Sequence, residues 1–331
     1  MMKNNNFWQE YKKKKQVILA LAPLAGFTDS TFRSLVKDYG ADVVYSEMAS
    51  VAALYYGGSK RDGALETKEL LKFKKKERPY VVQIFGSLPQ HFAQAARIIT
   101  QEIKPDGLDI NFGCPVPKII KQGAGSALML DLKRARAVIE AVLENTNLPV
   151  SIKIRARVKN VSALEFVKYM SDLPIAALMI HGRSFKQGFS GAVNHALVKE
   201  VRPFFSGLIL TNGGINSFTQ AHKALEISQA DGLGLGRGAL GRPWLFQEIK
   251  EGKEINLSSL DILGIILKQA QIFVAQKGEK SLPDLRKHLV WYVQGFPQAS
   301  KLRAQLVAIN SLADIEKIIN NYKEENYDTL D

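Results

Sequence analysis

The sequence predicts a protein of the α/β class, a (β/α)8 TIM barrel followed by a small all-α C-terminal domain. Eight short apolar runs alternate with amphipathic stretches within about 240 residues, which is the arrangement of eight strand–helix units. Polar residues and glycines follow most of these runs, and strand-like runs stop after Trp244. An open doubly wound sheet is the alternative, because periodicity does not reveal whether a sheet closes.

The predicted elements follow one another in a regular order. Each predicted strand is a short run rich in apolar residues: 17–22, 42–46, 80–85, 107–111, 150–154, 176–180, 207–211 and 232–236. Amphipathic periodicity predicts helices at 29–39, 90–102, 132–145, 163–171 and 218–228. The connection 51–78 is long, which predicts an extra helix or an insertion there.

Beyond Trp244 the chain shows only helical patterns, at 258–274, 282–295 and 299–322. We therefore expect a barrel domain over residues 1–245 and a helical domain over residues 246–331. The chain has a formal net charge of +13, of which the barrel contributes +14 and the helical domain −1. A strongly basic protein suggests a polyanionic partner such as a nucleic acid.

The composition argues against several classes of protein. Cys114 is the only cysteine, so an intrachain disulfide and a cysteine metal cluster are excluded, and we expect no metal. No apolar run approaches the roughly 18 residues of a membrane span. No cleavage-site pattern follows the lysines at 12–15, so we expect no signal peptide. One cysteine and no export signal predict a cytoplasmic protein.

Cys114 is also the first candidate catalytic residue. It lies on a Gly-Cys-Pro turn directly after the strand predicted at 107–111. That position is poor for core packing and good for reaching a substrate. The alternative is a small buried hydrophobe, which is what an unpaired cysteine usually is.

The ends of the last two predicted strands suit a phosphate group. Functional residues of a parallel barrel collect where its strands end, and loops after the seventh and eighth strands often bind phosphate. Here those strands end in Asn212-Gly213-Gly214 and in Gly236-Arg237, which offer backbone N–H groups and a guanidinium. Tight turns are the alternative explanation of these glycines.

Four further side chains lie at strand ends. Lys153 and Arg155 share one face of a strand, which predicts a bound anionic group or, alternatively, a salt bridge to a neighbouring strand. His181 follows an apolar strand, and Gln83 offers an amide that suits the edge of a heteroaromatic ring. This set, with Cys114 and the phosphate site, suits flavin mononucleotide (FMN) as a cofactor.

Over most of its length the chain closely resembles the tRNA-dihydrouridine synthases, and it looks most like their bacterial branch. The most specific motif is the loop Asp109-Ile110-Asn111-Phe112-Gly113-Cys114-Pro115-Val116-Pro117-Lys118. The other motifs are Ala22-Pro23-Leu24-Ala25-Gly26-Phe27-Thr28-Asp29, Gln83-Ile84-Phe85-Gly86, Gly123-Ala124-Gly125-Ser126-Ala127-Leu128, Lys153-Ile154-Arg155, His181-Gly182-Arg183, Asn212-Gly213-Gly214-Ile215, Gly236-Arg237-Gly238-Ala239-Leu240, and Arg286-Lys287-His288 with Trp291-Tyr292.

The resemblance implies an enzyme that uses FMN and NAD(P)H to reduce the C5=C6 bond of uridine in tRNA. FMN would give a hydride to C6, and Cys114 would give the proton to C5 as general acid. The cofactor-binding residues would be Pro23, Leu24, Ala25, Gln83, Lys153, His181, Asn212, Gly213, Gly214, Gly236 and Arg237. The tRNA-binding residues would be Asn111, Arg155, Arg183, Arg286 and Lys287, although Arg155 and Arg183 suit the flavin phosphate equally well.

Three positions depart from the family's pattern. Leu24 and Phe112 stand where many relatives have Met, which are conservative apolar changes. Gly214 stands where an acidic residue is common, so any contact from that side chain is lost.

Two other functions are compatible with these residues. An FMN-dependent barrel acting on a free pyrimidine, like a dihydroorotate dehydrogenase, shares the fold and cofactor but leaves the positive charge and added helices unexplained. A non-catalytic RNA-binding protein has no need of Cys114, Lys153 and His181 together.

Overall fold

The computed structural model describes residues 6–57 and 62–325. The chain divides into two compact units, Met1–Gly236 and Arg237–Asp331. Among the described residues, strands occur only in the first unit, and the second unit is helical. None of the helices described is long and apolar enough to cross a membrane.

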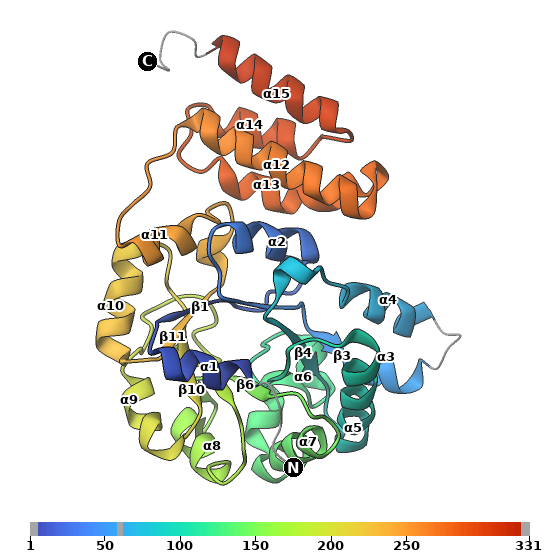
Figure 1. The fold of residues 1–331 in the computed structure, drawn as a ribbon, viewed down its shortest axis with the longest axis vertical. Coiled ribbons are helices and arrows are strands. Elements are labelled where there is room, and N and C mark those ends of the chain that lie inside the picture. Colours follow the sequence, from blue (N-terminus) through green and yellow to red (C-terminus); the bar gives the residue numbers. More distant parts are fainter. Residues whose placement is uncertain (1–5, 58–61, 326–331) are drawn as a thin grey trace. The chain divides into compact units, whose positions relative to one another are not determined.

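Eight parallel strands of the first unit close into a barrel (Figure 1). Their order is β2-β1-β11-β10-β9-β6-β5-β4, and β4 pairs again with β2, so the predicted TIM barrel is confirmed and the open sheet is excluded. Each strand begins and ends within one residue of its predicted position. The strands are β1 (Ile18–Leu21), β2 (Val43–Tyr45), β4 (Tyr80–Phe85), β5 (Gly107–Asn111), β6 (Val150–Arg155), β9 (Ala177–His181), β10 (Leu208–Asn212) and β11 (Gly232–Leu235).

Helices outside the barrel link successive strands (Figure 1). Side chains just before the first turn fix where several helices begin, because they accept backbone N–H groups of that turn. Asp29 accepts from Phe32, and Ser162 forms a capping box with Glu165. The helices are α2 (Ser30–Asp38), α5 (Pro89–Ile98, continued by a π-helical turn, Ile99–Ile103), α7 (Leu132–Glu144), α8 (Ala163–Tyr169), α9 (Leu197–Val201) and α10 (Phe218–Ser228).

Additional short elements lie near the carboxyl ends of the strands. The sequence predicts an extra helix or an insertion in the long connection before β4, and the structure has two helices there, while strand β3 pairs with the end of β4. The segment after Cys114 contains a short helix and a 3-10 turn. These elements are β3 (Ala49–Ser50), α3 (Val51–Tyr56), α4 (Asp62–Leu70), α6 (Pro117–Lys121), the 3-10 turn Gly125–Leu130, and the antiparallel pair β7 (Arg157–Val158) and β8 (Val161–Ser162).

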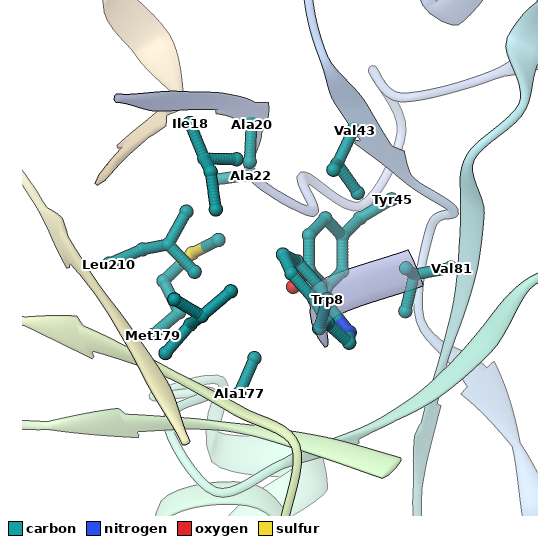
Figure 2. Packing of buried hydrophobic residues seen from close by; sticks show 11 residues of the cluster. Trp8, Ile18, Ala20, Ala22, Val43, Tyr45, Val81, Ala177, Met179 and Leu210 are labelled. Carbon is teal, nitrogen blue, oxygen red and sulfur yellow. The ribbon is translucent and has the colours of Figure 1, made fainter. Parts of the chain in front are cut away.

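An N-terminal helix that the sequence analysis did not predict, α1 (Phe7–Lys14), covers the amino end of the barrel. Asn6 caps it by accepting the N–H of Trp8 at 3.1 Å. The Trp8 side chain is 1% exposed and lies among inward side chains of β1, β2, β4, β9 and β10 (Figure 2). Tyr11 and Lys12 hold the helix in place by donating to the carbonyls of Asp42 and Ser206.

The inward side chains change in character along the barrel axis. Side chains alternate between the two faces of a strand, so every second residue points inward. Towards the amino ends these residues are apolar, as in the cluster of Trp8, Ile18 and Leu208. Towards the carboxyl ends of β4 to β10 they are polar, and the strand register aligns Gln83 with Asp109, Asn111 with Lys153, Arg155 with His181, and His181 with Asn212.

The second unit is built from helices, as predicted. The predicted helical stretch 299–322 is two helices, α14 and α15, separated by residues 307–311. The predicted stretch 282–295 begins as a 3-10 segment that contains Pro283, a residue with no N–H for a helical hydrogen bond. The elements are α11 (Leu245–Glu251), α12 (Ser259–Lys277), the 3-10 segment Glu279–Leu285, α13 (Arg286–Tyr292), α14 (Ala299–Leu306) and α15 (Leu312–Glu325).

Candidate active site

A series of hydrogen bonds connects β4 and β5 to the cysteine loop. Asn111 Nδ2 donates to Gln83 Oε1 at 2.8 Å, and Gln83 Nε2 donates to Asp109 Oδ2 at 2.7 Å. Asn111 Oδ1 accepts the backbone N–H groups of Gly113 (3.0 Å) and Cys114 (2.9 Å). The structure therefore brings Gln83, Asn111 and Cys114, which the sequence analysis singled out separately, into one network.

Cys114 lies in an apolar environment. Its side chain is 9% exposed and clusters with Ile119 and Ala124, against Met48 and Phe85. Burial raises the pKa of the thiol, although the Val116 N–H and the Arg155 and Lys153 charges oppose this change. The sulfur therefore stays protonated at neutral pH, which is the form that a general acid requires.

The turn at 123–126 holds the cysteine loop from its other side. Ser126 donates to the Cys114 carbonyl through both its backbone N–H (3.2 Å) and its hydroxyl (2.8 Å). Gly125 has φ +59°, and a Cβ there would lie 3.0 Å from Cys114 Cβ. Glycine at this position allows the close approach of the two segments.

Lys153 carries a positive charge into the barrel mouth. Burial, together with the Arg155 charge, lowers the pKa of Lys153 to about 8, while Asp109 and Cys114 act in the opposite direction. Among the described residues, no carboxylate lies within 4.0 Å of its ammonium, so the predicted alternative of a salt bridge is not found there. A partly buried ammonium in this situation is suited to binding an anionic group.

Asp109 is a buried carboxylate that interacts electrostatically with Lys153. Burial raises the pKa of Asp109 to about 6, although hydrogen bonds from Gln83 and Ser151 and the charge of Lys153 lower it. The Ser151 hydroxyl donates to Asp109 Oδ1 at 2.6 Å. Neither Asp109 nor Ser151 was assigned a role from the sequence. An acidic residue at an inward position of a buried strand was the available signal, because such a carboxylate requires partners.

His181 is a neutral imidazole. Burial and the charges of Lys153, Arg155 and Arg183 lower the pKa of His181 to about 2. Its Nδ1 accepts the backbone N–H of Arg183 at 3.3 Å, which leaves the proton on Nε2. His181 therefore presents a neutral N–H donor at the end of β9.

The two arginines predicted to bind tRNA or phosphate also hold loops of the barrel. Arg155 is 4% exposed and donates to the carbonyls of Gly113 (2.8 Å), Ser184 (3.2 Å) and Gly188 (3.1 Å). Arg183 is 9% exposed and donates from Nε to the Gly191 carbonyl at 2.9 Å. Their positive charges remain near Cys114 and His181, but Arg155 already donates to three carbonyls of the protein.

The loop after β10 contains two glycines whose backbone conformations other residues rarely adopt. Gly213 has φ +110° and Gly214 has φ +67°, both in the region that favours glycine. A Cβ at Gly213 would lie 3.1 Å from His181 Nε2, and one at Gly214 would lie 2.8 Å from a methyl group of Val193. The clash with Val193 gives a steric reason why this chain has glycine rather than an acidic residue at 214.

The remaining predicted cofactor residues lie on neighbouring loops. Asn212 is buried, and its Nδ2 donates to the Gly234 carbonyl at 2.6 Å, which ties the end of β10 to β11. Apart from its chain neighbours, the only atom of the described residues within 4 Å of a Cβ built on Gly236 is Leu24 Cδ2, at 3.7 Å. Pro23 and Leu24 are partly buried, whereas Ala25 and Arg237 are exposed.

The two predicted tRNA residues of the helical unit differ in their surroundings. Arg286 donates to the Ile309 carbonyl from Nε (2.9 Å) and Nη2 (2.6 Å), and to Asn310 Oδ1 (2.8 Å). Its guanidinium thus holds the connection between α14 and α15. Lys287 is exposed, and the adjacent His288 is buried with Gln269.

The fold and this site define a class of protein: a TIM barrel with a buried thiol, a depressed-pKa lysine and a neutral histidine at the carboxyl ends of its strands. The profile of the family described as Dihydrouridine synthase (Dus) matches residues 20–326. The chain belongs to the dihydrouridine synthase family and is an enzyme of that family.

Individual relatives extend over nearly the whole chain. A protein of Aquifex aeolicus named "Probable tRNA-dihydrouridine synthase" is 33% identical over 316 residues, covering 94% of this chain and 97% of the relative. A protein of Helicobacter pylori strain J99 with the same name is 32% identical over 317 residues, covering 95% and 93%.

Solved structures with little sequence similarity share the barrel. A 2-naphthoyl-CoA reductase in complex with 2-naphthoyl-CoA superposes with a TM-score of 0.54 at 12% identity, over 71% of this chain and 50% of that one. An old yellow enzyme homologue from Zymomonas mobilis gives a TM-score of 0.50 at 15% identity, over 74% and 91%. At these identities the likeness establishes the fold alone.

Proposed function

We propose that this protein reduces the C5=C6 bond of uridine in tRNA to 5,6-dihydrouridine, with FMN as cofactor and NAD(P)H as electron donor. The observation that carries the proposal is the protonated Cys114 thiol in a barrel mouth that also contains Lys153 and His181. Its relatives in Aquifex aeolicus and Helicobacter pylori, both named probable tRNA-dihydrouridine synthases, support this choice of substrate.

The residues at the barrel mouth fit a flavin ring. The Lys153 ammonium would interact with the part of the ring that becomes negative on reduction. The neutral His181 would donate from Nε2, and glycine at 213 leaves that edge of the imidazole uncovered, since a Cβ there would lie 3.1 Å away. Gln83 still has one N–H and one lone pair beyond its two hydrogen bonds.

The glycine loops fit the phosphate of FMN. Gly213 and Gly214 have positive φ angles and no side chain, so the backbone N–H groups of this loop would be accessible to the phosphate. The open surroundings of Gly236 leave room for a phosphate beside Leu24, and Arg237 follows directly in the chain. Pro23 and Ala25 flank Leu24 and would complete this part of the cofactor site.

Cys114 would complete the reduction as the proton donor. Bound FMN, when reduced by NAD(P)H, supplies the hydride that adds to C6 of uracil. The electron pair of the C5=C6 bond then takes the Cys114 proton at C5, so that the S–H bond breaks and a C–H bond forms. The resulting thiolate is stabilised by the charges of Arg155 and Lys153, which already favour the ionised sulfur.

The RNA must be held while the target base enters the barrel. A stacked uridine cannot reach Cys114, so the base has to leave the stack. We propose that the +14 formal charge of residues 1–245 attracts the phosphates, with Arg155 and Arg183 closest to the base and Asn111 beside Cys114. Residues 246–331, with Lys287 exposed, would contribute a second RNA contact, and we expect the enzyme to act in the cytoplasm.

The direct test is to incubate the purified protein with a tRNA transcript and NADPH or NADH. We expect dihydrouridine in the digested RNA by mass spectrometry, a yellow protein, and FMN rather than FAD after acid release. Free uridine should not be reduced at a comparable rate. Reduction of the free pyrimidine alone would replace the proposal with a small-molecule enzyme, and a colourless protein that FMN cannot reconstitute would overturn it.

A further inference from the structure

The buried hydrogen bonds around Asp109 form one continuous chain. Ser151 Oγ donates to Asp109 Oδ1 (2.6 Å), Gln83 Nε2 to Asp109 Oδ2 (2.7 Å), and Asn111 Nδ2 to Gln83 Oε1 (2.8 Å). Asn111 Oδ1 then accepts the backbone N–H groups of the Gly113-Cys114 turn at 3.0 and 2.9 Å. The four side chains are at most 8% exposed, so water does not compete for these bonds.

The two ends of this series are the Asp109 carboxylate and the backbone N–H groups of the Gly113-Cys114 turn. Their chemistry fixes the direction of every hydrogen bond between them. An ionised carboxylate can only accept hydrogen bonds, and backbone N–H groups can only donate them. Gln83 and Asn111 lie between these ends, and each amide has one accepting and one donating side. Only one orientation of both amides satisfies the whole chain, with Gln83 Nε2 facing Asp109 and Asn111 Oδ1 facing Cys114.

We propose that Asp109 is a positioning residue that holds the Cys114 turn in place through Gln83 and Asn111. This inference rests on the proposed function, in which the Cys114 sulfur must lie within reach of C5 of the bound uracil. Asp109 itself does not contact the substrate. It specifies which end of each amide points towards the cysteine loop.

The location of Asp109 supports a specific role. A carboxylate with no exposed surface lowers stability unless its partners satisfy it, and an apolar side chain of similar volume packs in such a place at less cost. Both oxygens of Asp109 accept hydrogen bonds, and only one of the two donors is part of the connection to Cys114. The Lys153 charge on β6 and the Tyr45 hydroxyl on β2 also interact electrostatically with Asp109.

Two substitutions separate hydrogen-bond polarity from charge. Asp109→Leu removes the acceptor, so Gln83 and Asn111 lose their fixed orientation. Asp109→Asn keeps an acceptor for Gln83, because its Nδ2 can face the Ser151 hydroxyl, which also accepts. We expect Asp109→Leu to lower the single-turnover rate of tRNA reduction by roughly 10–100-fold, the effect of a small misplacement of a reacting group. The rate is compared per molecule of bound FMN, because Gln83 also belongs to the proposed cofactor site, and Asp109→Asn should retain most of it.

The alkylation of Cys114 by iodoacetamide in flavin-free protein gives a second readout that does not depend on activity. Cys114 is the only thiol, so its alkylation rate reports on the cysteine turn directly. We expect the rate to rise severalfold in Asp109→Leu and to stay near wild type in Asp109→Asn. Thr211→Val is the matched control, because it removes a buried hydrogen bond to His195 that is not part of the connection from Asp109 to Cys114. It should change neither the reduction rate nor the alkylation rate.

Gln83→Met breaks the same series of hydrogen bonds at the next side chain. It tests the positioning role if Asp109→Leu does not fold. Gln83→Met should also raise the alkylation rate. The double variant should be alkylated at nearly the same rate as either single variant, because both substitutions break the same series of hydrogen bonds. Unchanged alkylation in both variants, or equal damage from Asp109→Asn and Asp109→Leu, would overturn the proposal. If wild-type protein fails to reduce tRNA while the alkylation pattern holds, the proposed function is wrong and the positioning of Cys114 stands.

Discussion

The two ends of the barrel interior are built from the same strands but from opposite kinds of residue. At the amino ends, Trp8 of α1 and small or aliphatic side chains of β1, β9 and β10 form part of an apolar core. Towards the carboxyl ends, Asp109 is buried, Lys153 and His181 are partly buried, and all three have strongly shifted pKa values. A residue that stabilises the fold and a residue that does chemistry can therefore differ only by their position along one strand.

The comparison can be tested most strongly at the polar end, with Cys114→Ala. This change removes the proposed proton donor and little binding surface, so we expect turnover on tRNA to fall by roughly 10²–10⁴-fold. FMN content, tRNA affinity and the free energy of unfolding should be close to those of the wild type. Stopped-flow reoxidation of the reduced enzyme by tRNA measures the step, and a wild-type rate would remove Cys114 from the mechanism.

The corresponding change at the apolar end is Trp8→Ala, and its expected effect is on stability. Removing a large, fully buried aromatic side chain costs about 3–5 kcal/mol of unfolding free energy. Urea unfolding of the flavin-free protein measures this loss, and the rate per folded molecule should be nearly unchanged. A rate that falls with no loss of stability would contradict the separation of the two ends. Val17→Ala, at an exposed residue between α1 and β1, is a control with little expected effect on either.

His181 belongs to the candidate site and also affects stability, because burying a neutral imidazole makes the free energy of unfolding depend on pH. The pKa of His181 is about 2 in the folded protein, well below its usual 6.5. Below pH 6.5 the unfolded chain therefore binds a proton that the folded protein does not, and unfolding becomes easier as the pH falls. The limiting slope is about 1.4 kcal/mol per pH unit for one proton.

His181→Gln should remove this dependence from flavin-free protein between pH 6.5 and 5. The raised pKa of Asp109, about 6, acts in the opposite direction over part of this range, but it is present in both proteins and cancels in the comparison. Urea unfolding of both proteins at several pH values gives the two slopes. Equal slopes for wild type and variant would show that His181 does not contribute.

The parts of this molecule that the sequence predicts are those determined by local pattern. Strand positions follow from short apolar runs, and the candidate site follows from residues placed where those runs end, such as Asn111 and His181. Helix α1 was missed because its lysines suggest a solvated segment, and nothing local indicates that Trp8 enters the barrel. The connection from Asp109 to Cys114 depends on the register between strands, which periodicity does not contain.

The smallest expected effect compares two neighbours in the helical unit, where sequence alone suggested a common role. Arg286 donates to the carbonyl of buried Ile309 and to exposed Asn310, so Arg286→Ala should lower the stability of this unit by about 1–3 kcal/mol, because the Ile309 carbonyl loses its donor. Lys287 is exposed, so Lys287→Ala should leave stability unchanged and weaken tRNA binding modestly.

Salt dependence tells a phosphate contact apart from a general loss of charge. If Lys287 contacts one phosphate, Lys287→Ala should reduce the slope of log affinity against log salt concentration by about 0.7–0.9. Lys317→Ala removes the same charge from an exposed position of α15 and is the matched control. Equal slopes for wild type and both variants would move the RNA contact to the barrel. The contact would then depend on its +14 formal charge and on the surface near Arg183, at the same end of the strands as Cys114.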